Sequence, residues 1–117
     1  MKKKSLKKTL AIIAIVAAAN PNGFTFNVKR GEIQNTGYAV ALSATQNSFG
    51  AEGFLKVVEY ALKNNIDCVG GWLDQLTGRF YFDATVIVDK KEKAIELGKA
   101  NNQIAIFNLY TKNEIRL

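Results

Sequence analysis

Short segments in which hydrophobic and polar residues alternate predict five to six strands. Phe24, Phe26 and Val28, for example, alternate with polar residues directly after a turn signal. In the second segment the small residues Ala39 and Ala41 share a face, which predicts a helix packed closely against that face. The predicted strands are residues 24–28, 37–43, 67–73, 79–88, 104–109 and 114–117.

Apolar residues recur at helical spacing between these strands. They form one stripe in residues 51–64 and another in residues 89–102, where Asp89 followed by Glu92 is typical of a capping box. With a helix at the N-terminus, the order is three times a helix followed by two strands, joined largely by hairpins. This order predicts the α+β class, a mostly antiparallel sheet with two to three helices packed on it, in a single domain over residues 1–117.

Net positive charge is concentrated at the N-terminus. The chain of 117 residues carries a formal charge of +6 from 16 basic and 10 acidic residues, and five lysines fall in the first eight positions. The rest of the chain is therefore nearly neutral. We interpret the arm either as a solvated chain end or as a contact with an anionic surface, nucleic acid or lipid. Its lysines are Lys2, Lys3, Lys4, Lys7 and Lys8.

Two interpretations remain open for residues 1–19. The basic start, the apolar run from Leu10 to Ala19 and the small residues at 17–19 are typical of a secretory leader, which would place the protein outside the cytoplasm. Alternatively, Leu6, Leu10 and Ile13 share a helical face, and the segment is a cytoplasmic helix packed on the domain and ended by Pro21. The run is too short to span a bilayer as a helix, because about 20 apolar residues are needed.

Composition excludes several kinds of catalytic site. The chain has no histidine and one cysteine, Cys68, so serine–histidine and cysteine–histidine nucleophiles and zinc-finger sites are excluded. No phosphate-binding glycine motif is present. Asp83, in an aromatic strand, is a weak candidate for a carboxylate pair with Asp67 or Asp74, and a solvated or Arg79-paired carboxylate is the simpler interpretation. We therefore expect no enzyme activity, no cofactor and no metal.

Five residues are candidates for partner binding. The single tryptophan follows Gly70–Gly71, and paired glycines in a strand indicate a bulge or a close backbone approach. A polar hairpin loop at 74–78 comes next, and a polar segment at 45–50 precedes the second helix. The alternatives are a tryptophan that lies in the core or covers a bulge, and a polar segment in which Asn47 or Ser48 caps the helix and the other residues are solvated. The candidates are Gln46, Asn47, Trp72, Asp74 and Tyr81.

An aromatic and basic sheet face of the kind that binds RNA is a further, weaker hypothesis, since no RNP-like string is present. That face would consist of Tyr38, Trp72, Arg79, Phe80 and Tyr81.

Several strings together resemble a group of small accessory proteins of phages and mobile elements of gut bacteria. They are residues 20–25, 45–50, 70–72, 80–83 and 102–108. The resemblance carries no catalytic residues. This chain departs from the group in its first helix, which is unusually apolar. The resemblance implies a protein that binds and blocks host machinery, such as an anti-CRISPR-type inhibitor of a defence nuclease.

Three functional hypotheses follow. The first is a non-enzymatic binding protein of this kind, which contacts a host protein or nucleoprotein complex, with a homodimer as a further expectation. The second is a secreted or periplasmic domain. The third is a nucleic-acid-binding accessory protein that uses the lysine arm.

Overall fold

A computed structural model describes residues 5–117 as three helices and an antiparallel sheet. The elements in chain order are α1 Leu6–Ala19, β1 Gly23–Asn27, β2 Glu32–Ile33, β3 Tyr38–Ala41, the 3₁₀ turn η1 Ser43–Thr45, β4 Ser48–Phe49, α2 Gly50–Lys63, β5 Cys68–Leu73, β6 Phe80–Val88, α3 Lys91–Ala100, β7 Ala105–Asn108 and β8 Asn113–Arg116.

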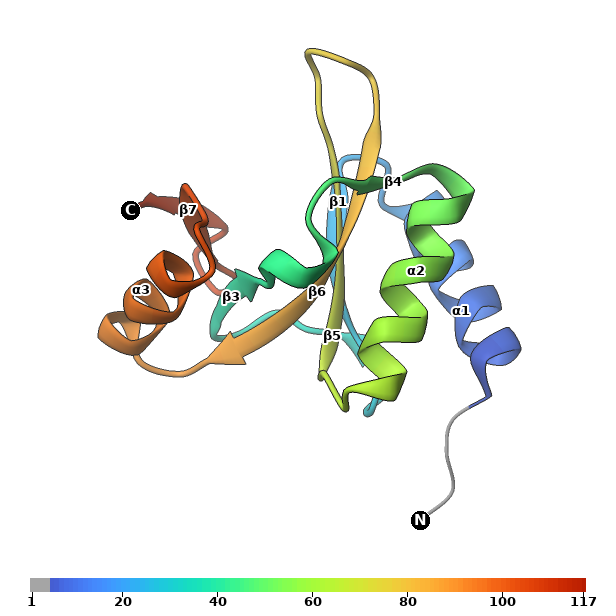
Figure 1. The fold of residues 1–117 in the computed structure, drawn as a ribbon, viewed down its shortest axis with the longest axis horizontal. Coiled ribbons are helices and arrows are strands. Elements are labelled where there is room, and N and C mark those ends of the chain that lie inside the picture. Colours follow the sequence, from blue (N-terminus) through green and yellow to red (C-terminus); the bar gives the residue numbers. More distant parts are fainter. Residues whose placement is uncertain (1–4) are drawn as a thin grey trace.

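The strands form one curled sheet in the order β2-β1-β5-β6-β3-β7-β8, and β4 also pairs with β6. β5 and β6 form the longest hairpin, whose tip projects beyond the rest of the sheet (Figure 1). β3 and β4 lie one after the other along the same edge of β6, because β5 occupies the opposite edge.

The three helices pack on one face of this sheet. Under α1 and α2 the core contains Ile13, Val57 and Val69, whereas α3 packs over a second cluster around Val40. Both clusters use the same face of β6, since Ala84 belongs to the first and Val88, an even number of residues away, to the second. In residues 5–117, no helix covers the opposite face.

The predicted α+β class is confirmed, and α2 and α3 are each followed by two strands as predicted. Four strands, β1 to β4, lie between α1 and α2, so the predicted pair of strands after the first helix is wrong. The described residues contain eight strands instead of five to six, because β2 and β4, with two residues each, lie in segments that read as a turn and a polar loop. Such short strands have too few residues to show an alternation.

Two local predictions are wrong. The N-cap of α3 is Lys90, without a side-chain hydrogen bond, so Asp89 does not cap this helix. The helices also pack on the side of β3 that carries Val40, not on the side of Ala39 and Ala41. Ala39 instead lies opposite Ile87 on the helix-free face.

Gly70 and Gly71 mark a close approach without a bulge, because β5 keeps an unbroken register with both neighbours. A Cβ at Gly71 would lie 2.5 Å from a Phe24 ring carbon and 2.6 Å from a Phe80 ring carbon. The missing side chain lets these two rings stack across β5, with centroids 6.1 Å apart. On the other face, Gly70 makes room for the carboxylate of Asp83.

Helix α1 is packed against the domain. Ile13 is fully buried in the core beneath α2, and Leu6, Leu10 and Val16 pack around it. Ser5 accepts a hydrogen bond from the Lys8 backbone N–H at the start of the helix. Among residues 5–117, no helix has the length and apolarity needed to cross a membrane.

Candidate functional site

Three aromatic side chains and one arginine meet on the helix-free face at the base of the projecting hairpin. The Trp72 and Tyr81 rings stack with centroids 4.9 Å apart, since the two residues are direct cross-strand partners. Phe49 of β4 meets the other side of Tyr81 edge-on at 5.5 Å. The guanidinium carbon of Arg79 lies 4.5 Å from the centre of the Phe49 ring. We call Phe49, Trp72, Arg79 and Tyr81 the hairpin cluster.

The rings of the cluster are packed against one another yet accessible. Trp72 is 48% exposed and Phe49 is 42% exposed, although both rings are held by Tyr81. Arg79 is also exposed and makes no ion pair with any acidic side chain in residues 5–117. The interpretation of Trp72 as a core residue is therefore wrong.

Buried hydrogen bonds place Phe49 beside Tyr81. Thr45 is fully buried, and its hydroxyl accepts a hydrogen bond from the backbone N–H of Ala84 at 2.9 Å, which anchors the preceding turn to β6. The Ser48 hydroxyl donates to the Thr45 carbonyl at 2.7 Å. β4 then pairs with β6 so that Phe49 lies opposite Tyr81.

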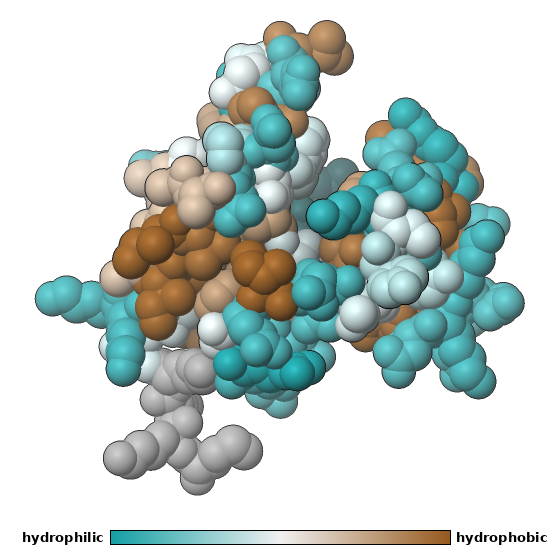
Figure 2. Space-filling model, turned by 180° about the vertical axis from the view of Figure 1, so that it is seen from behind, coloured by the Kyte–Doolittle hydropathy of each residue, from teal (hydrophilic) through white to brown (hydrophobic). Residues whose placement is uncertain are grey.

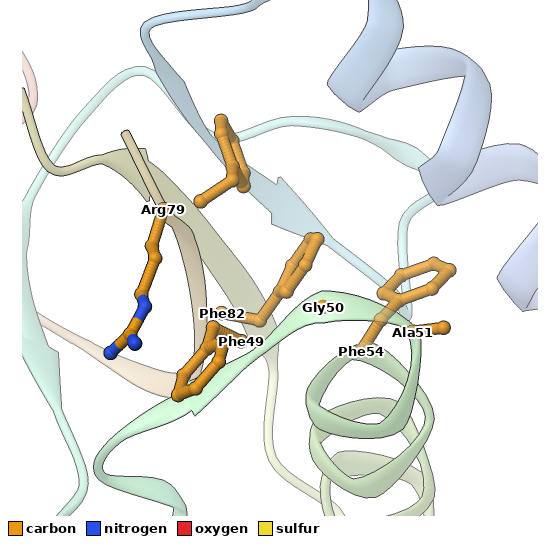
Figure 3. Close-up of a pocket in the computed structure, with 7 residues that line it drawn as sticks. Phe49, Gly50, Ala51, Phe54, Arg79 and Phe82 are labelled. Atoms are coloured by element: carbon orange, nitrogen blue, oxygen red, sulfur yellow. The ribbon is translucent and has the colours of Figure 1, made fainter. Parts of the chain in front are cut away.

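A pocket opens on the helix side of the same strand edge (Figure 3). Its volume is about 400 Å³, and its walls are almost entirely apolar. Phe54 of α2 packs on Phe82, with ring centroids 4.9 Å apart, and Phe82 in turn contacts Phe80. Phe49 and Arg79 belong to both the pocket and the hairpin cluster, so the two form one continuous surface around the edge of β6. The pocket is lined by Phe49, Gly50, Ala51, Phe54, Arg79, Phe80 and Phe82.

Of the five partner-binding candidates, Trp72 and Tyr81 are brought together directly. Gln46 and Asn47 are exposed and immediately precede β4, so they lie next to Phe49 along the chain. Neither Asn47 nor Ser48 caps α2, because the N-cap is Phe49 and no side chain caps the helix. The capping interpretation of this segment is therefore wrong.

Asp74 has a structural role in the hairpin loop. Its carboxylate accepts hydrogen bonds from the Leu76 backbone N–H and the Thr77 hydroxyl, both at 3.0 Å. Its backbone N–H also donates to the carbonyl of Arg79. These bonds shape the tip, where Leu76 is 97% exposed.

The carboxylate cluster considered for Asp83 does not form. Asp67 pairs with Lys29 at 2.8 Å, Asp74 holds the loop, and Asp83 accepts a hydrogen bond from the Thr85 hydroxyl. Burial raises the pKa of Asp83 to about 6, and the Thr85 bond opposes this shift. The expectation that the Asp83 carboxylate is solvated or paired with Arg79 is therefore wrong.

The remaining candidate residues do not belong to the hairpin cluster. Tyr38 packs in the α3 core and Phe80 lines the helix-side pocket, so the RNA-binding platform predicted from the sequence does not assemble. Lys7 and Lys8 are exposed on α1, far along the chain from the cluster, and residues 2–4 lie outside the described part of the chain. Within residues 5–117, no group of three or more His, Cys, Asp or Glu side chains is placed to hold a metal ion.

Comparisons with family models, curated proteins and solved structures find no match.

Sequence reasoning missed Phe49 as a member of the site. One signal was present, because Phe49 is the only large apolar residue in the polar segment 45–50. An apolar side chain that interrupts a polar loop indicates a local contact, here the edge of the Tyr81 ring.

Proposed function

We propose that this chain is a non-enzymatic protein-binding domain that docks through the hairpin cluster. The observation that carries the proposal is the exposure of Trp72 and Phe49 at 48% and 42% in a prearranged stack on Tyr81. Exposed aromatic rings that already pack against neighbouring rings lose little further conformational entropy when a partner binds.

The composition of the cluster matches that of interface hot spots. Tryptophan, tyrosine and arginine are the residue types that dominate binding energy at protein interfaces. Arg79 adds a cation without an ion-pair partner in residues 5–117, and the adjoining phenylalanine pocket adds a recess for an apolar side chain. Together these features favour a partner surface that presents an apolar side chain next to a carboxylate.

The narrower proposal concerns the identity of the partner. Resemblance to accessory proteins of phages and mobile elements supports a host protein or nucleoprotein, specifically a defence nuclease of the CRISPR type. A cleavage assay with a purified RNA-guided nuclease tests it directly. Inhibition by the wild-type chain that is lost with Trp72→Ala supports the proposal, and unchanged cleavage at saturating protein contradicts it for that nuclease.

The binding proposal is tested by quantitative affinity capture from host lysate with matched variants. Trp72→Ala and Arg79→Glu alter the hairpin cluster, whereas Tyr110→Ala removes an aromatic ring that is 78% exposed elsewhere on the surface. We expect one protein to be captured by the wild type and by Tyr110→Ala, and each cluster variant to weaken its binding about 30-fold, or about 2 kcal/mol.

The outcome that contradicts the proposal is equally specific. Equal retention of every captured protein by Trp72→Ala, Arg79→Glu and the wild type would show that the hairpin cluster does not bind. Thermal melts of the same variants exclude unfolding as the cause of a loss, because both cluster side chains are exposed.

We further propose that residues 6–19 remain on the mature domain in the cytoplasm. Ile13 is fully buried among core residues of α2 and β5, so removal of α1 would expose that core to water. Mass spectrometry of the protein from its native host distinguishes this proposal from secretion: an intact N-terminus supports it, and a chain that begins at Asn20 contradicts it.

A further inference from the structure

From Ala11 to Ala19, every exposed residue of α1 is apolar. While Ile13 is buried, Ile12 is 40% exposed and Ile15 is 71% exposed, and the other exposed residues of this segment are alanines. Figure 2 shows apolar side chains gathered in a patch on this side of the molecule. A contiguous apolar patch of this kind indicates an interaction surface more strongly than scattered single residues do. The exposed apolar residues of α1 are Ala11, Ile12, Ala14, Ile15, Ala18 and Ala19.

The charges beside this face all have one sign. Lys7 and Lys8 lie exposed in the first turn of α1, which has no acidic residue. Cations in the first turn are unfavourable for the helix, because the N-terminal end of the helix dipole is itself positive. The first acidic residue of the chain is Glu32, so residues 1–31 supply no carboxylate to balance these lysines. An anion from outside the chain would compensate both the lysines and the dipole.

We propose that α1 lies in the plane of an anionic lipid surface. The outward isoleucines and alanines would enter the boundary between headgroups and acyl chains, and the lysines at the helix start would contact lipid phosphates. The 14-residue helix is about 21 Å long, so it lies on the bilayer and does not span it. Its other face stays packed on the core through Ile13, so the domain remains folded on the membrane.

A lipid surface accounts for both the exposed apolar residues and the uncompensated lysines of this face, whereas nucleic acid or a second copy of the chain accounts for only one of them. Nucleic acid would neutralise Lys7 and Lys8 but would gain nothing from Ile15. A second copy packed α1 to α1 would bury Ile15 but would bring no carboxylate, because the helix contains none. The hairpin cluster is a separate surface on another part of the sheet, so this inference does not depend on the proposed protein partner.

The test is binding of the purified full chain to vesicles, measured by co-sedimentation. One set consists of phosphatidylcholine with about 30% phosphatidylglycerol, and the other of phosphatidylcholine alone. Ile15→Glu places a charge in the outward face, Lys7→Glu with Lys8→Glu reverses the cations, and Leu76→Glu is the control at an exposed apolar residue outside α1.

We expect binding to the anionic vesicles that weakens with added salt and is weak on phosphatidylcholine alone. Ile15→Glu should reduce it at least tenfold and the lysine reversal at least as much, whereas Leu76→Glu should bind like the wild type. All three variants should melt like the wild type, since the changed side chains are exposed.

Three results would overturn the inference. The first is a wild-type chain that does not bind anionic vesicles at physiological salt. The second is binding that Ile15→Glu leaves unchanged, because the lysines alone would then account for it. The third is a dimer without lipid that Ile15→Glu dissociates, because a second copy would then cover this face.

Discussion

Replacing Gly71 by alanine tests how the fold builds the base of the hairpin. The added Cβ would lie 2.5 Å and 2.9 Å from two ring carbons of Phe24 and 2.6 Å from one of Phe80, so the stacked rings must separate. Overpacking of this kind costs about 1–3 kcal/mol. Alanine recovers about 0.5–1 kcal/mol, because glycine is costly in a strand. We therefore expect a net loss of about 1 kcal/mol in the free energy of unfolding.

Urea denaturation measures this loss as a lower midpoint at an unchanged m-value. The origin of the loss is separated by a double-mutant cycle with Phe24→Leu, which removes one of the two clashing rings. We expect the two changes to be less destabilising together than the sum of their separate effects, by about 1 kcal/mol. A Gly71→Ala variant as stable as the wild type, or strictly additive effects, would refute the close-packing explanation of this glycine.

Three further predictions concern single groups. Burial raises the folded-state pKa of Asp83 to about 6, whereas an aspartate in the unfolded chain has a pKa of about 3.9. The stability that protonated Asp83 contributes is therefore fully present below about pH 4 and is lost as the pH rises through about 6. Asp83→Asn should therefore stabilise the fold at pH 7 by up to about 3 kcal/mol and have little effect at pH 3.5, as measured by urea titrations at both values; equal effects at both pH values would contradict the assignment. Cys68 is fully buried, and burial is the main cause that raises the pKa of its thiol to about 12. A thiol reagent at pH 8 should therefore modify Cys68 only as fast as the domain opens, and immediate modification of the native protein would contradict this prediction. Asn65 has a φ of 58° just after α2. In thermal melts, Asn65→Gly should therefore be neutral or slightly stabilising, and Asn65→Ala should destabilise the fold by about 1 kcal/mol. A residue with a regular helical φ would not give this ranking of the two variants.

Periodicity was sufficient to predict the long elements. β6, with nine residues, and the amphipathic α2 carry enough repeats for their period to be read directly from the sequence. β2 and β4 could not be found in this way, because two residues do not define a period and their pairing is fixed by neighbouring strands. The helix side of β3 was misassigned for a related reason, since local pattern does not show which face of a strand the sheet presents to the helices.

The candidate site was predictable where its residues are unusual. Trp72 stands out as the single tryptophan beside paired glycines, and Tyr81 lies in an aromatic strand. Phe49 and the ring-stacking role of Arg79 depend on the register between β4 and β6, which tertiary structure sets through the buried hydroxyl of Thr45. The sequence also did not show that hydrogen bonds within the loop occupy the Asp74 carboxylate.

Site-specific photo-crosslinking tests the central claim most directly, because it reports which surface touches the partner. A photoreactive phenylalanine analogue replaces Phe49 in one protein and Tyr110 in another, since both side chains are aromatic and exposed. On irradiation in host lysate, we predict a covalent adduct of one defined mass at position 49 that disappears with Trp72→Ala, and no such adduct at position 110. The same adduct from both positions, or none at position 49 beside one at position 110, would contradict docking through the hairpin cluster.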